Sequence, residues 1–191
     1  MARGITHYGG YIPRLRMARE TIFSAHAWMN PGLRGASAGM RAFGDWDEDA
    51  ITFGTEAVRD ALPEDARADV DRFMFCSTTL PFAYRQNSVL AATALGLSPS
   101  AQCLDVGGSD NTALIALSQA CQTAGSSTLI AAGERVRTPA MSLMEMRVGA
   151  GGAAVKIGDE NVLAELVGEG HASADFVDRF RPGAEDFDYL W

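Results

Sequence analysis

The sequence has no surplus of basic residues. Its 191 residues include 16 Lys and Arg against 24 Asp and Glu, which gives a formal net charge of -8 at pH 7. A nucleic-acid-binding face needs clustered Lys and Arg to neutralise phosphates. The charge balance therefore argues against nucleic acid as a partner.

Cysteine is scarce, and its spacing is not that of a metal site. Cys76, Cys103 and Cys121 are odd in number and contain no C-x-x-C pair. They lie in segments that otherwise read as buried strand or helix. We expect three reduced thiols in or near the core.

Long apolar runs are also missing. No stretch approaches the ~20 apolar residues that span a bilayer. The N-terminus does not combine a basic start, an apolar run and a small-residue cleavage site, the pattern of a secretory signal. The sequence contains no internal repeat and no low-complexity segment. These absences predict a cytoplasmic protein with no membrane partner.

What the sequence does contain is enough apolar material for one core. A chain of this length with 47% hydrophobic residues suits a single globular domain. Apolar runs that alternate with helical patterns, and then give way to two adjacent runs, predict an α/β fold with a largely parallel central sheet, helices on its faces and an antiparallel hairpin. The expected strands are residues 4–13, 73–79, 102–106 and 127–132, with 153–157 and 162–167 as the hairpin; the expected helices are about 17–28, from 51 onward, 86–95 and 112–124.

Buried parallel strands are apolar on both sides, so the pattern also predicts core residues. We expect burial of Cys76, Cys103, Val106, Leu129 and Ile130. An acidic cluster at residues 45–49 could be a metal site, but carboxylates directly before a periodic run are more typical of a helix start. The tail, residues 174–191, is charged and aromatic and carries no capping signal, so we expect a main domain over 1–173 followed by a connecting tail.

Two polar features follow predicted strands. The run FMFC at residues 73–76 ends in the hydroxyls of Ser77, Thr78 and Thr79, and the strand at 102–106 ends in the turn GGSDN, which leads into a helix. The carboxyl ends of neighbouring parallel strands lie at one edge of a sheet, where α/β proteins bind ligands. These segments are the candidate site.

The segment 105–110 (DVGGSD) resembles the nucleophile turn of the thiolase superfamily, in particular of hydroxymethylglutaryl-CoA synthase and the third type of ketoacyl-ACP synthase. Four further segments match the same proteins in the same order: 75–79, 133–135, 149–154 and 175–182. The resemblance covers the chain from Gly4 to Tyr189 and corresponds to the N-terminal half of those proteins. It implies that a second half, which carries the family's catalytic histidine and asparagine, lies in another chain or in a missing segment.

The departures from the family pattern matter as much. The resemblance places Asp110 where the condensing enzymes have their nucleophilic cysteine, and Thr78 where the synthase has its acid/base glutamate. A carboxylate is a weak acyl acceptor, and the mixed anhydride it would form is far more labile than a thioester. We therefore expect no covalent acyl-enzyme at Asp110.

Asp110 has two interpretations. As a helix-capping carboxylate in a degenerate site, it would be stabilised by the N–H groups and dipole of the following helix. As a general base, it would remove a proton from carbon next to a thioester carbonyl, or from a β-hydroxyl in a retro-aldol cleavage. Ser77 and Thr78 could donate hydrogen bonds into the same pocket, although hydroxyls at a strand end more often satisfy local backbone groups.

Arg85 lies just beyond the hydroxyl-bearing strand end. Its guanidinium could bind a phosphate of coenzyme A, or it could form a surface or interface salt bridge. The glycine run at 149–152 lacks the Lys and Ser/Thr of a P-loop and is interpreted as a close-packed turn. His7, His26 and His171 match no catalytic motif. We assign them no chemistry.

The resemblance implies a subunit of a thiolase-like complex that makes or breaks carbon–carbon bonds of acyl-CoA thioesters. The acyl-CoA would be a substrate, and no covalently bound cofactor is expected. Expected partners are a second thiolase-fold half or subunit and a zinc-ribbon or OB-fold protein, in a homo- or hetero-oligomer. The alternative is a non-catalytic scaffold that stabilises an active partner.

Overall fold

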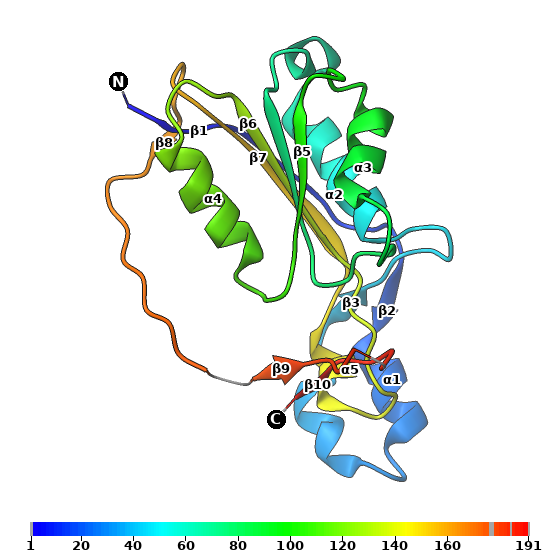
Figure 1. The fold of residues 1–191 in the computed structure, drawn as a ribbon. Helices are drawn as coiled ribbons and strands as arrows, with labels where there is room; N and C mark the ends of the chain where they lie inside the picture. Colours follow the sequence, from blue (N-terminus) through cyan, green and yellow to red (C-terminus); the bar gives the residue numbers. More distant parts are fainter. Residues whose placement is uncertain (1, 176–177, 184, 191) are drawn as a thin grey trace.

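The structure, a computed structural model, describes residues 2–175, 178–183 and 185–190. Its centre is a six-stranded sheet with the order β5-β4-β6-β7-β1-β8 (Figure 1). The strands are β1 (Gly4–Tyr11), β4 (Arg72–Cys76), β5 (Gln102–Val106), β6 (Thr128–Glu134), β7 (Gly151–Gly158) and β8 (Ala164–Glu165). The order of the strands in the sheet differs from their order along the chain. Segments that connect parallel neighbours must therefore cross over a face of the sheet.

Strand directions confirm the predicted α/β class. β4 is parallel to β5 and to β6, whereas β7 is antiparallel to both β6 and β1, and β8 is antiparallel to β1. It follows that β5, β4, β6 and β1 run in one direction and that β7 and β8 run in the other. The parallel part, β5-β4-β6, is the part that carries the candidate site.

The predicted hairpin is wrong in its pairing. β7 and β8 are consecutive strands, but β1 lies between them and pairs with both. The N–H of Leu163 donates to the carbonyl of Ile5 at 2.8 Å, which starts the β8 pairing. Gly4 makes the close approach possible, because a Cβ at this position would collide with the carbonyl oxygen of Ala164. The two strands are close in sequence, which suggested a hairpin. Their own sequences could not reveal that β1 would lie between them.

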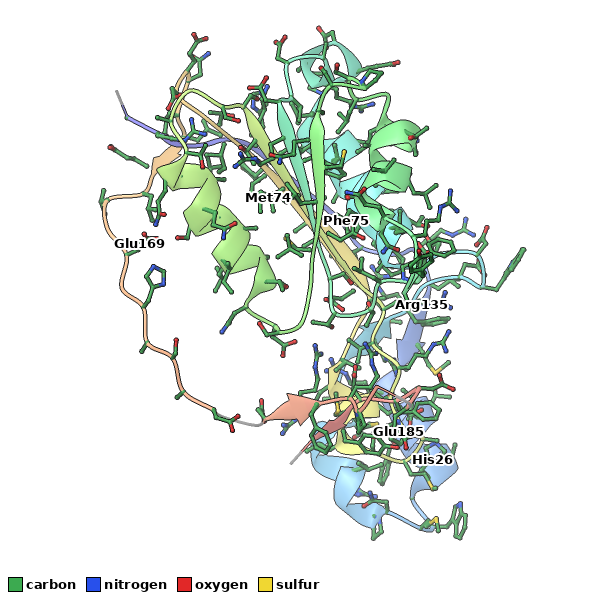
Figure 2. All side chains as sticks on the ribbon, viewed as in Figure 1. His26, Met74, Phe75, Arg135, Glu169 and Glu185 are labelled. Atoms are coloured by element: carbon green, nitrogen blue, oxygen red, sulfur yellow. The ribbon has the colours of Figure 1, made fainter. Side chains whose placement is uncertain are left out.

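Helices cover both faces of the sheet. α2 (Ala50–Ala61) and α3 (Asn87–Leu95) lie on one face, and α4 (Thr112–Gln122) lies on the other (Figure 1). Alternation along β4 supplies both interfaces: Phe73 and Phe75 belong to the core under α2 and α3, whereas Met74 belongs to the core under α4. Figure 2 shows Met74 and Phe75 on these opposite sides.

The predicted core is confirmed in part. Cys76, Leu129 and Ile130 are buried. Cys103 and Val106 are only half-buried, because β5 is the edge strand of the sheet and has no neighbour on one side. The strand itself occurs where it was predicted, so the error concerns its place in the sheet.

The acidic cluster is a helix start, as predicted. Asp49 is the N-cap of α2, and its side chain accepts a hydrogen bond from the backbone N–H of Thr52 at 2.9 Å. This bond satisfies one of the N–H groups that a helix start leaves unpaired.

A smaller lobe lies below the sheet in Figure 1. It contains β2 (Arg16–Ala18), α1 (Arg19–His26), the 3-10 turn η1 (Pro31–Ala36), β3 (Met40–Ala42) and α5 (Leu143–Arg147) around a core of Ile22, Phe23, Leu33 and Met146. A second 3-10 turn, η2 (Glu64–Arg67), precedes β4. The helix predicted over about 17–28 is present as α1, which is shorter than expected.

The tail returns to the body of the molecule. After β8 an extended segment passes α4, where the Glu169 carboxylate accepts hydrogen bonds from Ser118 and Gln122. β9 (Arg179–Phe180) then pairs with β10 (Tyr189–Leu190) in a separate antiparallel ribbon (Figure 1). Phe176, Val177 and Trp191, which belong to the predicted tail, lie outside the described residues.

Candidate functional site

A cavity of about 960 Å³ opens at the carboxyl ends of β4 and β5. Three segments form its walls: the turn between β5 and α4, the residues after β4, and the β9-β10 ribbon. Its lining includes Ser77, Thr78, Arg85 and Asp110, together with Asp105, Arg179 and Arg181. The structure therefore brings all the residues predicted for the site to one cavity.

The turn after β5 begins with Gly107 and Gly108. Gly108 has a φ of +100°, a conformation that favours glycine. The helix α4 begins at Thr112, so Asp110 lies one residue before the N-cap, Asn111. The tight turn that leads into a helix was predicted from the sequence.

Asp110 does not cap the helix. Asn111 has no side-chain cap bond, and the backbone N–H of Thr112 instead donates to the carbonyl of Ser109 at 3.3 Å. Asp110 projects into the cavity, and its Oδ1 accepts a hydrogen bond from Nη2 of Arg179 in β9. The capping interpretation is therefore wrong, because Asn111 occupies the N-cap position and the Asp110 carboxylate pairs with Arg179.

Glu134, at the end of β6, organises the hydroxyl-bearing strand end. Its carboxylate accepts the backbone N–H of Thr78 at 2.6 Å, the Thr78 hydroxyl at 2.9 Å and the Thr79 hydroxyl at 2.9 Å. Ser77 Oγ accepts the backbone N–H of Thr79 at 2.9 Å. Only Ser77 thus bonds a local backbone group, as expected, whereas the hydroxyls of Thr78 and Thr79 donate to a carboxylate distant in sequence. Sequence analysis gave Glu134 no role although it recognised the segment around it.

Asp105, near the end of β5, holds the start of α3. Its carboxylate accepts the backbone N–H groups of Asn87 at 2.8 Å and Ser88 at 2.7 Å, and also the Asn87 side-chain amide at 2.9 Å. Partial burial acts to raise the pKa of Asp105, but the hydrogen bonds from Ser88 and Asn87 outweigh it and hold this pKa below its ordinary value. Asp105 is a second acid that sequence analysis missed.

Arg85 lies at the mouth of the cavity. Its guanidinium carbon stands 5.1 Å from the centroid of the Phe82 ring, a cation–π contact. Among the described residues, no ion pair involves Arg85, so its planar fork of donors is available to a ligand.

The thiols offer no nucleophile to this site. Burial raises the pKa of Cys76 to about 12. Burial likewise raises the pKa of Cys103, where the nearby charge of Asp105 adds to the effect, and the pKa of Cys121. A reactive thiol needs a lowered pKa.

The described residues contain no cluster of three or more His, Cys, Asp or Glu side chains able to hold a metal ion. The described helices include none with the length and apolarity needed to cross a bilayer. The chemistry available at the cavity is that of the carboxylates of Asp105, Asp110, Asp178 and Asp188, together with hydroxyls and guanidinium groups.

Comparisons with known proteins agree with the fold. No protein-family model matches the chain. The hydroxymethylglutaryl-CoA synthase of Pyrococcus furiosus is 31% identical over 168 residues, which cover 83% of this chain and 45% of that protein. The synthase of Methanocaldococcus jannaschii is 29% identical over 189 residues, which cover 93% of this chain and 54% of that protein.

Solved structures show the same fold. An HMG-CoA synthase complexed with CoA superposes with a TM-score of 0.87 at 16% identity, over 100% of this chain and 50% of that one. PksG, an HMG-CoA synthase from Bacillus subtilis, superposes with a TM-score of 0.83 at 20% identity and is covered to 49%. The chain is homologous to hydroxymethylglutaryl-CoA synthases, has the fold of one half of these thiolase-like proteins, and spans about half the length of the curated relatives that it matches.

Proposed function

We propose that this chain is one half of a thiolase-type assembly that makes or breaks a carbon–carbon bond of an acyl-CoA thioester. The observation that supports this most is the position of Asp110 at the β5–α4 turn, on the wall of a 960 Å³ cavity. The homologues' name as synthases of a CoA ester supports the substrate class.

Coenzyme A would enter as part of the substrate, without a covalent bond to the chain. One solved neighbour is a complex with CoA, which supports a CoA site in this fold. Arg85 is the residue proposed to bind a CoA phosphate, because its guanidinium lies at the cavity mouth and the described residues offer it no carboxylate.

Asp110 would act as a general base. Its carboxylate would take a proton from the carbon next to the thioester carbonyl, and the electron pair left on that carbon would attack a second carbonyl to form the new bond. In the reverse direction, it would take the proton of a β-hydroxyl, and the bond between the α and β carbons would break. Neither step requires an acyl-enzyme.

The remainder of the site would come from a complementary half. α4 packs Ala116 and Ala120 against the sheet, whereas Leu114 is 65% exposed and Ile115 is 49% exposed on its outer side. We propose that the complementary half, from another chain or another segment, packs on these side chains, and that a zinc-ribbon or OB-fold protein joins the assembly. Apolar helix faces of this kind mark protein interfaces.

Titration calorimetry with coenzyme A, on the full chain together with any chain that co-purifies from its native host, tests the substrate class. Arg85→Met should weaken binding about tenfold, as expected for one lost charge-assisted contact to a phosphate. Arg59→Met is the matched control, because Arg59 pairs with Glu56 on α2 and does not line the cavity. Equal binding by all three proteins would remove Arg85 from the CoA site, and no binding by any of them would contradict the site itself.

The catalytic role has its own test. Exchange of the methyl hydrogens of acetyl-CoA for deuterium in heavy water, measured on the same assembly, should slow roughly 10²-fold in Asp110→Asn, because the amide cannot accept the proton. An unchanged exchange rate would remove Asp110 from the chemistry.

A second function, a non-catalytic scaffold, has a specific observation in its favour. The hydroxyls of Thr78 and Thr79 donate to Glu134, and Asp110 pairs with Arg179, so these polar groups already have partners within this chain. A scaffold would bind the complementary half with the same affinity when Asp110 is replaced, and the activity of the assembly would not change.

A further inference from the structure

Four side chains from four segments form one continuous chain of hydrogen bonds. The Thr78 hydroxyl donates to Glu134 at 2.9 Å and accepts from Nη2 of Arg179 at 3.2 Å. The same nitrogen of Arg179 donates to Oδ1 of Asp110. Charges alternate along this chain, from the Glu134 carboxylate through the guanidinium to the Asp110 carboxylate, so each ionic group faces a donor or acceptor of the right kind.

The two ends of the Asp110–Arg179 pair differ in exposure. The Arg179 side chain is 19% exposed, whereas the Asp110 side chain is 63% exposed. The arginine is therefore the fixed member, and the carboxylate, which follows the Gly107–Gly108 turn, is the member that it holds. Oδ2 of Asp110 has no hydrogen-bond partner among the described residues and is free to face a ligand.

Arg179 is itself anchored by the ribbon that carries it. β9 pairs with β10, and the rings of Phe180 and Tyr189 lie 6.0 Å apart. Arg181 donates to the carbonyl of Thr78 and lies 3.4 Å from the buried carboxylate of Asp188. The backbone N–H of Asp188 donates to the carbonyl of Arg137 at 3.0 Å. These bonds attach the tail to the ends of β4 and β6.

We infer that Arg179 is the positioning residue of Asp110, and that the β9-β10 ribbon, which carries Arg179, is part of the site. The catalytic part of this inference rests on the proposed role of Asp110 as a base. A guanidinium suits the task because one nitrogen bonds Thr78 and Asp110 together while the group keeps its charge. Occupation of Oδ1 directs Oδ2 toward the substrate proton.

Backbone amide NMR of the full chain tests the contact without any activity measurement. Arg179→Met should shift the amide signals of Ser109, Asp110 and Asn111, because the held carboxylate becomes free to change rotamer. Arg181→Met is the matched control: it removes another arginine of the same ribbon, one bonded to Thr78 and Asp188 but not to Asp110. Turn signals that respond equally to both variants, or to neither, would overturn the inference.

A double-mutant cycle tests the effect on turnover. Arg179→Met should slow hydrogen–deuterium exchange at the methyl group of acetyl-CoA roughly tenfold, with KM within about twofold, and Arg179→Lys should recover part of the loss. In the Asp110→Asn background, Arg179→Met should cause no further fall, since a residue that acts through Asp110 has nothing left to position. Losses that multiply would mean that Arg179 acts elsewhere and would overturn the inference.

The two proposals fail separately. A silent Asp110→Asn variant in which Arg179→Met still shifts the turn signals would end the proposed base role and would support the positioning contact. A strong Asp110→Asn effect with turn signals unmoved by Arg179→Met would keep the base and remove Arg179 as its positioning residue.

Discussion

Asp105 and Asn87 are joined by two hydrogen bonds, one from the backbone N–H of Asn87 and one from its side-chain amide, both to Oδ2 of Asp105. The Asn87 amide also donates to the carbonyls of Phe82 and Arg85, and Oδ1 of Asn87 accepts the N–H of Phe82. One carboxylate at the edge strand thus fixes both the start of α3 and the loop that carries Arg85.

This relationship predicts an acid-sensitive fold. The pKa of Asp105 lies below its ordinary value of 3.8 in the folded protein, so its contribution to stability is complete above that value and is lost as the pH falls through the folded pKa. Urea unfolding at pH 7, 5, 4 and 3 should show stability falling mainly below about pH 5. Asp105→Asn should be less stable at pH 7 and should lose less of its stability on acidification; a steeper loss in the variant would contradict the assignment.

Asp110 should matter little to stability. It makes no capping bond, and its ion pair with Arg179 is exposed on the carboxylate side. Asp110→Ala should therefore change the free energy of unfolding by less than about 1 kcal/mol. Asp49→Ala, which removes a real N-cap, should cost about 1 kcal/mol and provides the comparison. A larger loss for Asp110 than for Asp49 would restore the capping interpretation.

Glycines let α2 lie directly on the sheet. A Cβ on Gly133 would collide with the carbonyl of Ala50, and one on Gly152 would collide with the carbonyl of Phe53, so neither obstacle is a flexible side chain. Gly133→Ala or Gly152→Ala should cost about 3 kcal/mol, because the helix must move away from β6 and β7. Gly35→Ala meets nothing within 4 Å and should be nearly neutral in thermal unfolding. Neutral behaviour of all three would contradict this packing.

The three thiols should not accept acyl groups. The pKa of Cys76 is raised to about 12, and the pKa values of Cys103 and Cys121 are also raised, so the thiolate fraction at pH 8 is small. Intact-mass spectrometry after incubation with acetyl-CoA should detect the unmodified mass only. Alkylation by iodoacetamide should be slowest at Cys76, which is 1% exposed, and rapid acylation of any of the three would refute this account.

A charged substitution tests whether the complementary half packs on the outer face of α4. Ile115→Glu should abolish co-purification of the complementary half while leaving the chain folded, because the substituted side chain already lies at the surface. Val89→Glu is the control, since Val89 is similarly exposed on α3, which covers the opposite face of the sheet. Retention of the partner by Ile115→Glu would place the interface elsewhere.

Local patterns predicted the elements of this chain well. The strand at 102–106, the helix beginning at Thr112 and the capped start of α2 follow from apolar periodicity and from residues next to one another in sequence. That Cys103 is only half-buried could not be predicted in the same way. The apolar pattern of β5 does not reveal that this strand lies at the edge of the sheet.

The contacts of the site escaped prediction for a related reason. Thr78 and Glu134 are 56 positions apart, and Asp110 and Arg179 are 69 apart. Hydroxyls at a strand end and a carboxylate after a glycine turn were recognisable as site residues from their local setting. Which charged side chains would meet them depended on the strand order and on the return of the tail, and neither leaves a local signal.

The insertion of β1 between β7 and β8 has a consequence for folding during synthesis on the ribosome. β1 takes both of its neighbours from residues 151–165, which are synthesised long after it. Until those residues emerge, β1 has two unpaired edges and neither of its native neighbours, so its backbone must stay solvated or be shielded by a chaperone. Pairings over so long a sequence separation also slow folding. The sheet must therefore close late, and a nascent chain stalled before residue 151 would expose its N-terminal strand to aggregation.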